Sequence, residues 1–313
     1  MLQTRRSRLP LISALLYPVV YLLLCLPLSA ASVEIVDNGG TVHHFEQPAS
    51  RIISLYPAHT ENLVNLGAAS SLLGISKSDT VSDSTRSAAR FSHHDSLEKF
   101  IAADPDCILI RPMIERSRPD LIEKLRDYGI RVISLQPTSF DELYPYWHAL
   151  GRLSGTEKEA EKMIAGFKEE LQEIRRAQED LEPSRRPRVY FESIHARMRT
   201  FSPDSISMFT LQAAGGINIA ADATSRHGTN IAGYSKERIL AKSHEIDVFL
   251  AQSGRMNRIT VDEIVNEPGF GAIKAVRENR VYLIDEDLVS RPTIRLLEGI
   301  RQIQQLIHHQ PLS

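Results

Sequence analysis

Short apolar runs alternate with helix-like segments twice along this chain, once on each side of a long amphipathic stretch. In the first half, "RIISLY" (51–56) and "CILIR" (107–111) are each followed by residues with helical apolar spacing. In the second half the alternation returns between "RVYFESI" (188–194) and "RVYLID" (280–285). Strands that alternate with helices build parallel sheets with helices on both faces. The pattern therefore predicts two α/β units.

The stretch between the two halves has the spacing of a single amphipathic helix. Its apolar residues recur at steps of three, four and seven, which place them on one stripe: Ala160, Met163, Ile164, Phe167, Leu171, Ile174 and Leu181. At about 1.5 Å per residue the helix would span roughly 37 Å, longer than an ordinary crossover helix. We therefore predict two Rossmann-like α/β lobes (32–155 and 183–313) bridged by one long helix (156–182).

The first 31 residues have the composition of an export signal. Three arginines precede an almost wholly apolar run at 11–28, and small residues follow it in "LSAAS". We predict a signal peptide that is cleaved after Ala31 and exports the chain to the periplasm. A retained membrane anchor is the alternative. Lipidation of Cys25 is less favoured, because Leu24 stands where a lipobox needs a small residue.

The composition excludes some classes of function and weakens others. A 42% hydrophobic and 24% charged chain is typical of a soluble globular protein. The net charge of −2, without a basic tract, argues against nucleic-acid binding. No HExxH, GxSxG or P-loop motif occurs, which disfavours a secreted metal-dependent enzyme. Beyond the predicted signal peptide the chain has one cysteine, Cys107, so we expect no internal disulfide and a buried thiol.

One phrase occurs once in each predicted lobe. "DSLEKF" (95–100) and "YSKERIL" (234–240) both contain serine, any residue, glutamate and a basic residue at the start of a helix-like segment. Glu98 and Glu237 occupy the same slot. On physical grounds alone, each carboxylate would favour the positive end of its helix macrodipole.

Several longer stretches resemble one known family. They include "PASRIISLYPAHTENLVNLGAASSLLGIS" (48–76), "AAGGINIAAD" (213–222) and "VNEPGFGAIKAVRENRVYLID" (265–285). In this order and spacing the chain is similar to the periplasmic substrate-binding proteins of the cobalamin and ferric-siderophore ABC importers. The resemblance implies a monomer with a ligand cleft between two lobes, no enzymatic activity and no resident cofactor. It also implies that Glu98 and Glu237 dock onto the permease dimer in the inner membrane.

Loops at the carboxyl ends of the strands should supply the ligand contacts. The candidates are mostly cationic or imidazole side chains: Tyr56, His59, Lys77, His93, His94, Arg111, His195, Arg197, Arg199, His227, Arg255 and Arg291. Arginine forks match carboxylate or catecholate oxygens, so we expect a metal chelate, with an anionic ferric siderophore as the leading ligand. His59 is also expected to cap the first helix.

Three further ideas about the ligand and the role remain open at this stage. Cobalamin-binding relatives line the cleft with aromatic residues, whereas this chain has one tryptophan, Trp147, outside the predicted cleft loops. This departure disfavours a corrinoid, which is kept with haem and a small-ligand complex of nickel or cobalt as an alternative to the siderophore. His93 or His94 from one lobe, with His195 or His227 from the other, could ligate a metal held in a chelate or an open haem position. Alternatively, these histidines could simply hydrogen-bond a ligand or face water. A sensor subunit that signals to a membrane receptor is a further alternative.

Overall fold

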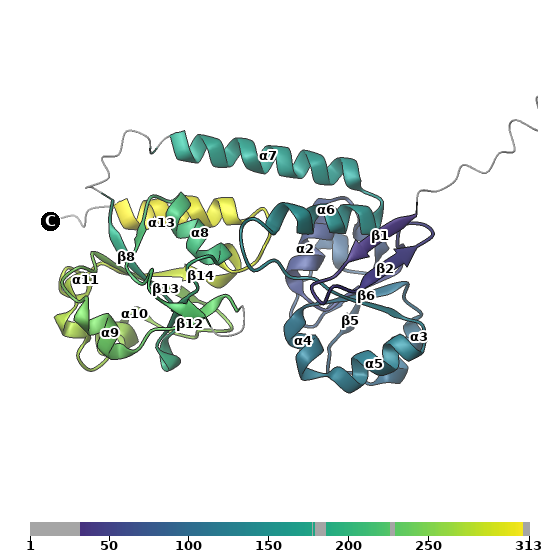
Figure 1. The fold of residues 1–313 in the computed structure, drawn as a ribbon, viewed down its shortest axis with the longest axis horizontal. Coiled ribbons are helices and arrows are strands. Elements are labelled where there is room, and N and C mark those ends of the chain that lie inside the picture. The colour runs from purple at the N-terminus through teal and green to yellow at the C-terminus, as the bar shows by residue number, and fades with distance from the viewer. Residues whose placement is uncertain (1–31, 177, 179–185, 226–228, 309–313) are drawn as a thin grey trace, which may run out of the picture.

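The computed structural model describes residues 32–176, 178, 186–225 and 229–308, and shows two α/β lobes with helix α7 (Glu157–Arg176) lying across them (Figure 1). The predicted signal peptide, His227 and most of the chain between Arg176 and Arg186 lie outside the described residues. Within the part that is described, no helix has both the length and the apolar character needed to span a membrane.

The first lobe is built on the parallel sheet that the sequence predicts. Its strand order is β5 (Ala89–Phe91), β4 (Leu72–Ser76), β3 (Ile52–Ser54), β6 (Cys107–Ile110) and β7 (Arg131–Ser134), and every neighbouring pair is parallel. All residues of β6 are buried, as expected for a strand covered on both faces. The buried Cys107 thiol confirms the prediction for this cysteine.

Helices cover both faces of this sheet. One face carries α2 (Pro57–Asn65) and α6 (Leu143–Ser154), and the other carries α3 (Leu97–Ala103), α4 (Pro112–Ser117) and α5 (Pro119–Asp127). We did not predict α4 or α6. Each contains a proline in its first turn, Pro112 and Pro145, where the missing N–H costs no helical hydrogen bond. Pro112 and Pro145 therefore lie in the first turns of helices and not in loops.

A β-hairpin precedes the first sheet, as the Asn38-Gly39 turn signal predicts. Strands β1 (Val33–Val36) and β2 (Val42–Phe45) pair antiparallel, with His43 buried and His44 exposed.

The second lobe has a mixed sheet. Strands β8 (Arg188–Ile194), β13 (Val248–Ser253) and β14 (Val281–Asp285) are parallel, and β10 (Ile217–Asn218) pairs parallel with β8. An antiparallel edge follows, made of β9 (Arg199–Phe201), β12 (Ile231–Gly233) and β11 (Thr224–Ser225). We expected the strand-helix alternation to restart without such an edge. The difference arises because β8 turns directly into β9 through the 3₁₀ turn His195–Arg197.

Helices also cover both faces of the second sheet. The face toward α7 carries α8 (Ile206–Ala213), α12 (Glu286–Val289) and α13 (Leu296–His308). The opposite face carries α9 (Lys236–Ala241), α10 (Val261–Val265) and α11 (Lys274–Arg277).

Helix α7 and the segment before α13 both connect the lobes. Helix α7 buries the predicted stripe at Ala160, Ile164, Phe167, Leu171 and Ile174, and packs against α6 of the first lobe and α13 of the second. The second connection is the segment before α13. The carbonyl oxygen of Pro292 accepts hydrogen bonds from Asn62 Nδ2 at 2.9 Å and Trp147 Nε1 at 3.1 Å, both in the first lobe and both buried.

Candidate functional site

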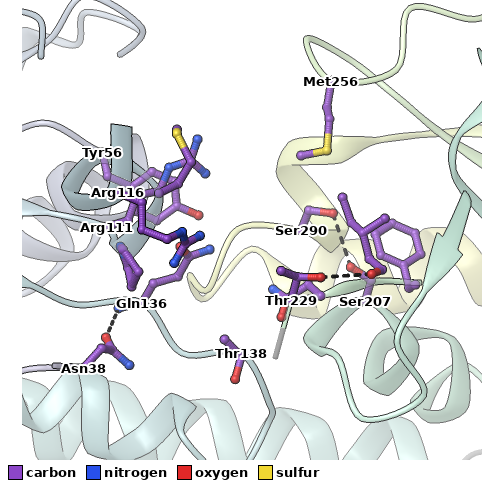
Figure 2. A pocket seen from close by; sticks show the side chains of 15 residues that line it. Asn38, Tyr56, Arg111, Arg116, Gln136, Thr138, Ser207, Thr229, Met256 and Ser290 are labelled. Carbon is purple, nitrogen blue, oxygen red and sulfur yellow. Dashed lines mark hydrogen bonds between the residues drawn. The ribbon is translucent and has the colours of Figure 1, made fainter. Parts of the chain in front are cut away.

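A cleft lies between the lobes. One hollow of about 440 Å³ is lined by both, with Tyr56, Arg111 and Arg116 on one side and Met256 and Ser290 on the other (Figure 2). An adjoining hollow of about 430 Å³ shares four of these residues with the first. A third, of about 320 Å³, also contains Tyr56 and Arg111. The shared lining makes the three hollows parts of one cleft, within the volume range of ligand sites.

Strand ends of the first sheet position the cationic wall. Strand β3 ends just before Tyr56, the N-cap of α2, and the neighbouring β6 ends just before Arg111, the N-cap of α4. Because the carboxyl ends of neighbouring parallel strands meet at one edge, the two side chains lie together. The Arg111 guanidinium carbon is 5.0 Å from the centroid of the Tyr56 ring, a cation–π contact.

The first-lobe wall carries positive charge that no described carboxylate neutralises. Among the described residues, no carboxylate lies within salt-bridge distance of Arg111 or Arg116. By contrast, Arg291 is paired with Asp287 at 2.6 Å between Nη2 and Oδ1. A guanidinium pair with free forks suits a ligand that presents carboxylate, catecholate or phosphate oxygens.

The part of the second lobe that lines the first hollow is mostly neutral, whereas Arg255, Glu286, Asp287 and Arg291 line the adjoining hollow. Ser207 and Ser290 are joined by a hydrogen bond of 3.2 Å between their hydroxyl oxygens, and Phe201, Ile231 and the exposed Met256 supply apolar surface. Figure 2 shows Ser207, Ser290 and Met256 across the cleft from Arg111 and Arg116. The first hollow can therefore hold the part of a ligand that is charged on one side and less polar on the other.

The third hollow is lined by Lys77, His93, His94, Arg111 and Arg255. The two imidazole rings lie 4.0 Å apart between centroids. Burial lowers the pKa of His93, and the nearby His94, Arg118 and Arg111 lower it further. His93 is thus favoured in its neutral form, in which it can accept a hydrogen bond as well as donate one.

Arg255 reaches across the cleft. It belongs to the second lobe, and its Nη1 donates to the carbonyl oxygen of Ser78 in the first lobe at 3.3 Å. With Lys77, His93, His94, Arg111 and Arg291, Arg255 is among the predicted residues that the structure places at the cleft.

His59 does not lie at the cleft. It is fully buried inside α2; Nε2 donates to the carbonyl oxygen of Ile110 at 3.1 Å, and Nδ1 accepts from the Tyr146 hydroxyl at 2.7 Å. Burial lowers its pKa to about 4. The helix begins at Pro57, with Tyr56 as its cap, so the expected capping and ligand roles of His59 are both wrong.

Three predicted residues of the second lobe also lie away from the cleft. His195 is buried, with Nδ1 at 3.0 Å from the Glu192 carboxylate and Nε2 at 3.6 Å from Glu267 Oε2. The hydrogen bond to Glu192 raises the pKa of His195. Arg197 is exposed in the turn, and Arg199 belongs to β9 beside Gly233. The prediction of a cleft loop for this segment is wrong because residues 188–201 form a β-hairpin.

His195 is not available to ligate a metal together with a histidine of the first lobe, because the carboxylates of Glu192 and Glu267 already contact its ring. Its alternative partner, His227, lies outside the described residues. In the described part of the chain, no three side chains of histidine, cysteine, aspartate or glutamate are arranged to hold a metal ion.

Several cleft residues are not predicted from the sequence, chiefly Arg116, Gln136 and Ser207. Arg116 lies in the last turn of α4, whose N-cap is Arg111. A prediction of α4 from the sequence would therefore have indicated Arg116 as a second arginine near Arg111. No sequence signal distinguishes Ser207 from the other serines of the chain.

Glu98 and Glu237 have matching environments in the two lobes. Each is the second residue of its helix, α3 or α9, and each follows a serine N-cap. Both side chains are exposed. The backbone N–H of Glu98 and the Ser96 hydroxyl lower the pKa of Glu98, and the Ser235 hydroxyl and its own N–H lower that of Glu237. Both helices lie on the side of their lobe away from α7 (Figure 1).

Comparisons with known proteins agree with this architecture. A family model described as periplasmic binding protein matches residues 52–288. The chain is 26% identical to an uncharacterised ABC transporter substrate-binding lipoprotein, YvrC, of Bacillus subtilis, over 88% of this chain and 85% of that protein. It is 26% identical to the vitamin B12-binding protein of Vibrio cholerae, over 82% and 88% respectively.

A solved structure has the same fold. The crystal structure of a possible iron-binding, periplasmic solute-binding protein of Staphylococcus epidermidis superimposes with a TM-score of 0.72 at 25% identity. The match covers 84% of this chain and all of that one.

Proposed function

The chain belongs to the periplasmic binding protein family, and we propose that it is the substrate-binding component of an ABC importer whose cargo is an anionic ferric siderophore. The observation that carries the choice of cargo is the pair Arg111 and Arg116, which face the cleft with no carboxylate partner among the described residues. Arginine in a confined site binds oxyanion-rich ligands through paired N–H donors.

A corrinoid is the second candidate, and one comparison favours it. The Vibrio cholerae relative is a vitamin B12-binding protein. Against a corrinoid here, Trp147 is buried and donates to Pro292, so it offers no ring to the cleft. The aromatic residues in the first hollow are Tyr56 and Phe201, and Tyr56 is already covered by Arg111.

A binding panel that varies ligand charge tests the cargo. Purified protein is titrated by calorimetry with ferric enterobactin and ferric citrate, which are anionic, and with ferrichrome and cyanocobalamin, which are uncharged. We expect tight binding of an anionic ligand, weaker binding at high salt, and about a 10- to 100-fold loss in Arg111→Ala. Arg301→Ala, which removes an exposed arginine on α13, is the control. Preference for cyanocobalamin would contradict the proposal.

We further propose that Glu98 and Glu237 form the contact with the permease. Two exposed carboxylates on separate lobes, held at equivalent helix starts, suit basic residues on the two halves of a membrane dimer. Such pairs set orientation and association rate more than they set affinity.

The relatives carry transport names, which supports a role in binding and delivery and not in catalysis. We propose that the protein acts in the periplasm as a monomer. The predicted signal peptide supports export, and the lipoprotein relative keeps lipidation of Cys25 as the alternative mode of retention.

A further inference from the structure

Asp95 connects the ligand cleft to the helix that carries Glu98. Its Oδ1 is 2.8 Å from the Lys77 ammonium, and its Oδ2 is 2.6 Å from that of Lys99. Oδ2 also accepts from the Ser92 backbone N–H at 3.0 Å. The Asp95 side chain is only 12% exposed, whereas that of Lys77 is 58% exposed. The carboxylate is therefore fixed, and the lysine is the partner that can move.

Among the lysine and arginine side chains that line the third hollow, Lys77 alone forms a salt bridge with a described carboxylate. The hollow is also lined by Arg111 and Arg255, and neither is within salt-bridge distance of a described carboxylate. An oxyanion in the hollow would lie next to the Lys77 ammonium. The oxyanion would have to share the Lys77 ammonium with Asp95 or displace Asp95 from it.

We propose that Asp95 is a built-in competitor for the Lys77 ammonium, which limits the affinity for an anionic ligand and links occupancy of the cleft to the ionic contact that holds the first turn of α3. The inference rests on the proposed function, because it requires an anionic cargo. The mechanism is exchange of counter-ions: the ligand oxyanion replaces Asp95 at Lys77, and Asp95 is left with Lys99 and the Ser92 N–H.

The link to α3 follows from the position of Lys99. It comes directly after Glu98, and its ammonium donates to Asp95 and, at 2.7 Å, to the carbonyl oxygen of Arg90. The basic residue of the repeated phrase thus fastens the first turn of α3 to the loop that lines the cleft. If Lys77 leaves Asp95, the ionic contact between Asp95 and Lys99 changes as well. Lys99 is next in sequence to Glu98, the proposed docking residue.

The second lobe provides a matched control. Asp222 holds the corresponding basic residue, Arg238, at 2.6 Å, and also pairs with Lys242 at 3.1 Å and the Tyr234 hydroxyl at 3.0 Å. None of these four residues lines the described cleft hollows. Asp222→Asn removes the same charge from an equivalent contact without freeing a cleft lysine.

The first test measures affinity. Wild type, Asp95→Asn and Asp222→Asn are titrated by calorimetry with ferric enterobactin and ferric citrate, with uncharged ferrichrome as the charge control. We expect Asp95→Asn to bind the anionic chelate about two- to five-fold more tightly, the range for removal of one partly exposed ion pair. Asp222→Asn should match wild type, and the response to ferrichrome should not change in either variant.

The second test measures the link to α3. Hydrogen–deuterium exchange of residues 97–100 is compared with and without saturating ferric chelate. We expect the ligand to change exchange in wild type and not in Lys77→Met, because no ammonium is then available to leave Asp95.

Each outcome bears on one claim. Equal or weaker anion binding by Asp95→Asn, or an equal gain in Asp222→Asn, overturns the competition. A ligand response that persists in Lys77→Met overturns the link to α3. Failure of wild type to bind either anionic chelate contradicts the proposed function and removes the inference with it.

Discussion

His59 is an imidazole that its burial holds neutral. Its Nε2 donates to Ile110 and its Nδ1 accepts from Tyr146, whose hydroxyl oxygen also accepts from Asn62 at 3.3 Å. A proton on Nδ1 would break this arrangement inside the core. The residue that we assigned to the ligand therefore belongs to the stability of the first lobe.

This placement predicts acid sensitivity. The pKa of His59 is about 4 in the folded protein, against 6.5 for the ordinary group, so the unfolded chain takes up the proton at higher pH. The contribution to stability is complete above about pH 6.5 and is lost as pH falls toward 4, up to roughly 3 kcal/mol. Urea unfolding between pH 4 and 7 measures it.

The controls for this prediction are two substitutions. His59→Gln should be less stable at pH 7 and should lose most of the pH dependence in this window. His44→Gln, on the exposed side of β2, should keep it. An unchanged pH dependence in His59→Gln would contradict the assignment.

At the scale of elements, the repeated phrase produces two equivalent helix starts. In both α3 and α9 the serine is the N-cap, the glutamate is exposed, and the basic residue bonds to an aspartate, Asp95 or Asp222. The sequence alone could indicate the repetition. It could not indicate that the two aspartates differ in their access to the cleft, because that depends on the fold around Lys77.

Charge reversal tests the proposed docking helices. In Glu98→Lys with Glu237→Lys, radioiron uptake by iron-limited cells should be nearly lost, because lysines would face basic residues of the permease. Calorimetric affinity for the ferric chelate should stay within about two-fold, since both residues lie outside the cleft. Glu159→Lys with Glu169→Lys, exposed on α7, matches the charge change and should transport normally. Uptake by the first double variant at the wild-type rate would refute the docking pair.

The sequence predicted elements better than it predicted contacts. The spacing of apolar residues correctly predicted the first sheet, the hairpin and α7, because this spacing is a property of short segments of the sequence. The proline-started helices α4 and α6 and the β8–β9 hairpin were missed, and with them Arg116 and the true positions of His195 and Arg199. Which residues face the cleft depends on how the two lobes meet, which no local pattern contains.

At the scale of the whole molecule, Pro292 limits how the lobes can move. Its carbonyl oxygen accepts from Asn62 and Trp147, so the lobes are joined through this segment as well as through α7. We expect closure on ligand binding to be small. Arg255, which already reaches Ser78, would then adjust over a short distance.

Removal of this contact should weaken the molecule. Asn62→Ala deletes the buried hydrogen bonds to Pro292 and Tyr146 and should lower the free energy of unfolding by about 1–3 kcal/mol. Asn266→Ala, exposed at the end of α10, should change it by less than about 0.5 kcal/mol. Urea titration compares the two. Equal effects would show that the Pro292 contact contributes nothing to stability.

The central claim is that the cleft carries an anionic metal chelate. The most direct measurement is native mass spectrometry, with metal analysis, of the protein purified from the cells that produce it under iron limitation. The account predicts a stoichiometric adduct that contains iron and an acidic organic ligand, and its loss in Arg111→Ala. A cobalt-containing corrinoid adduct, or an iron adduct that Arg111→Ala retains in full, would contradict the account.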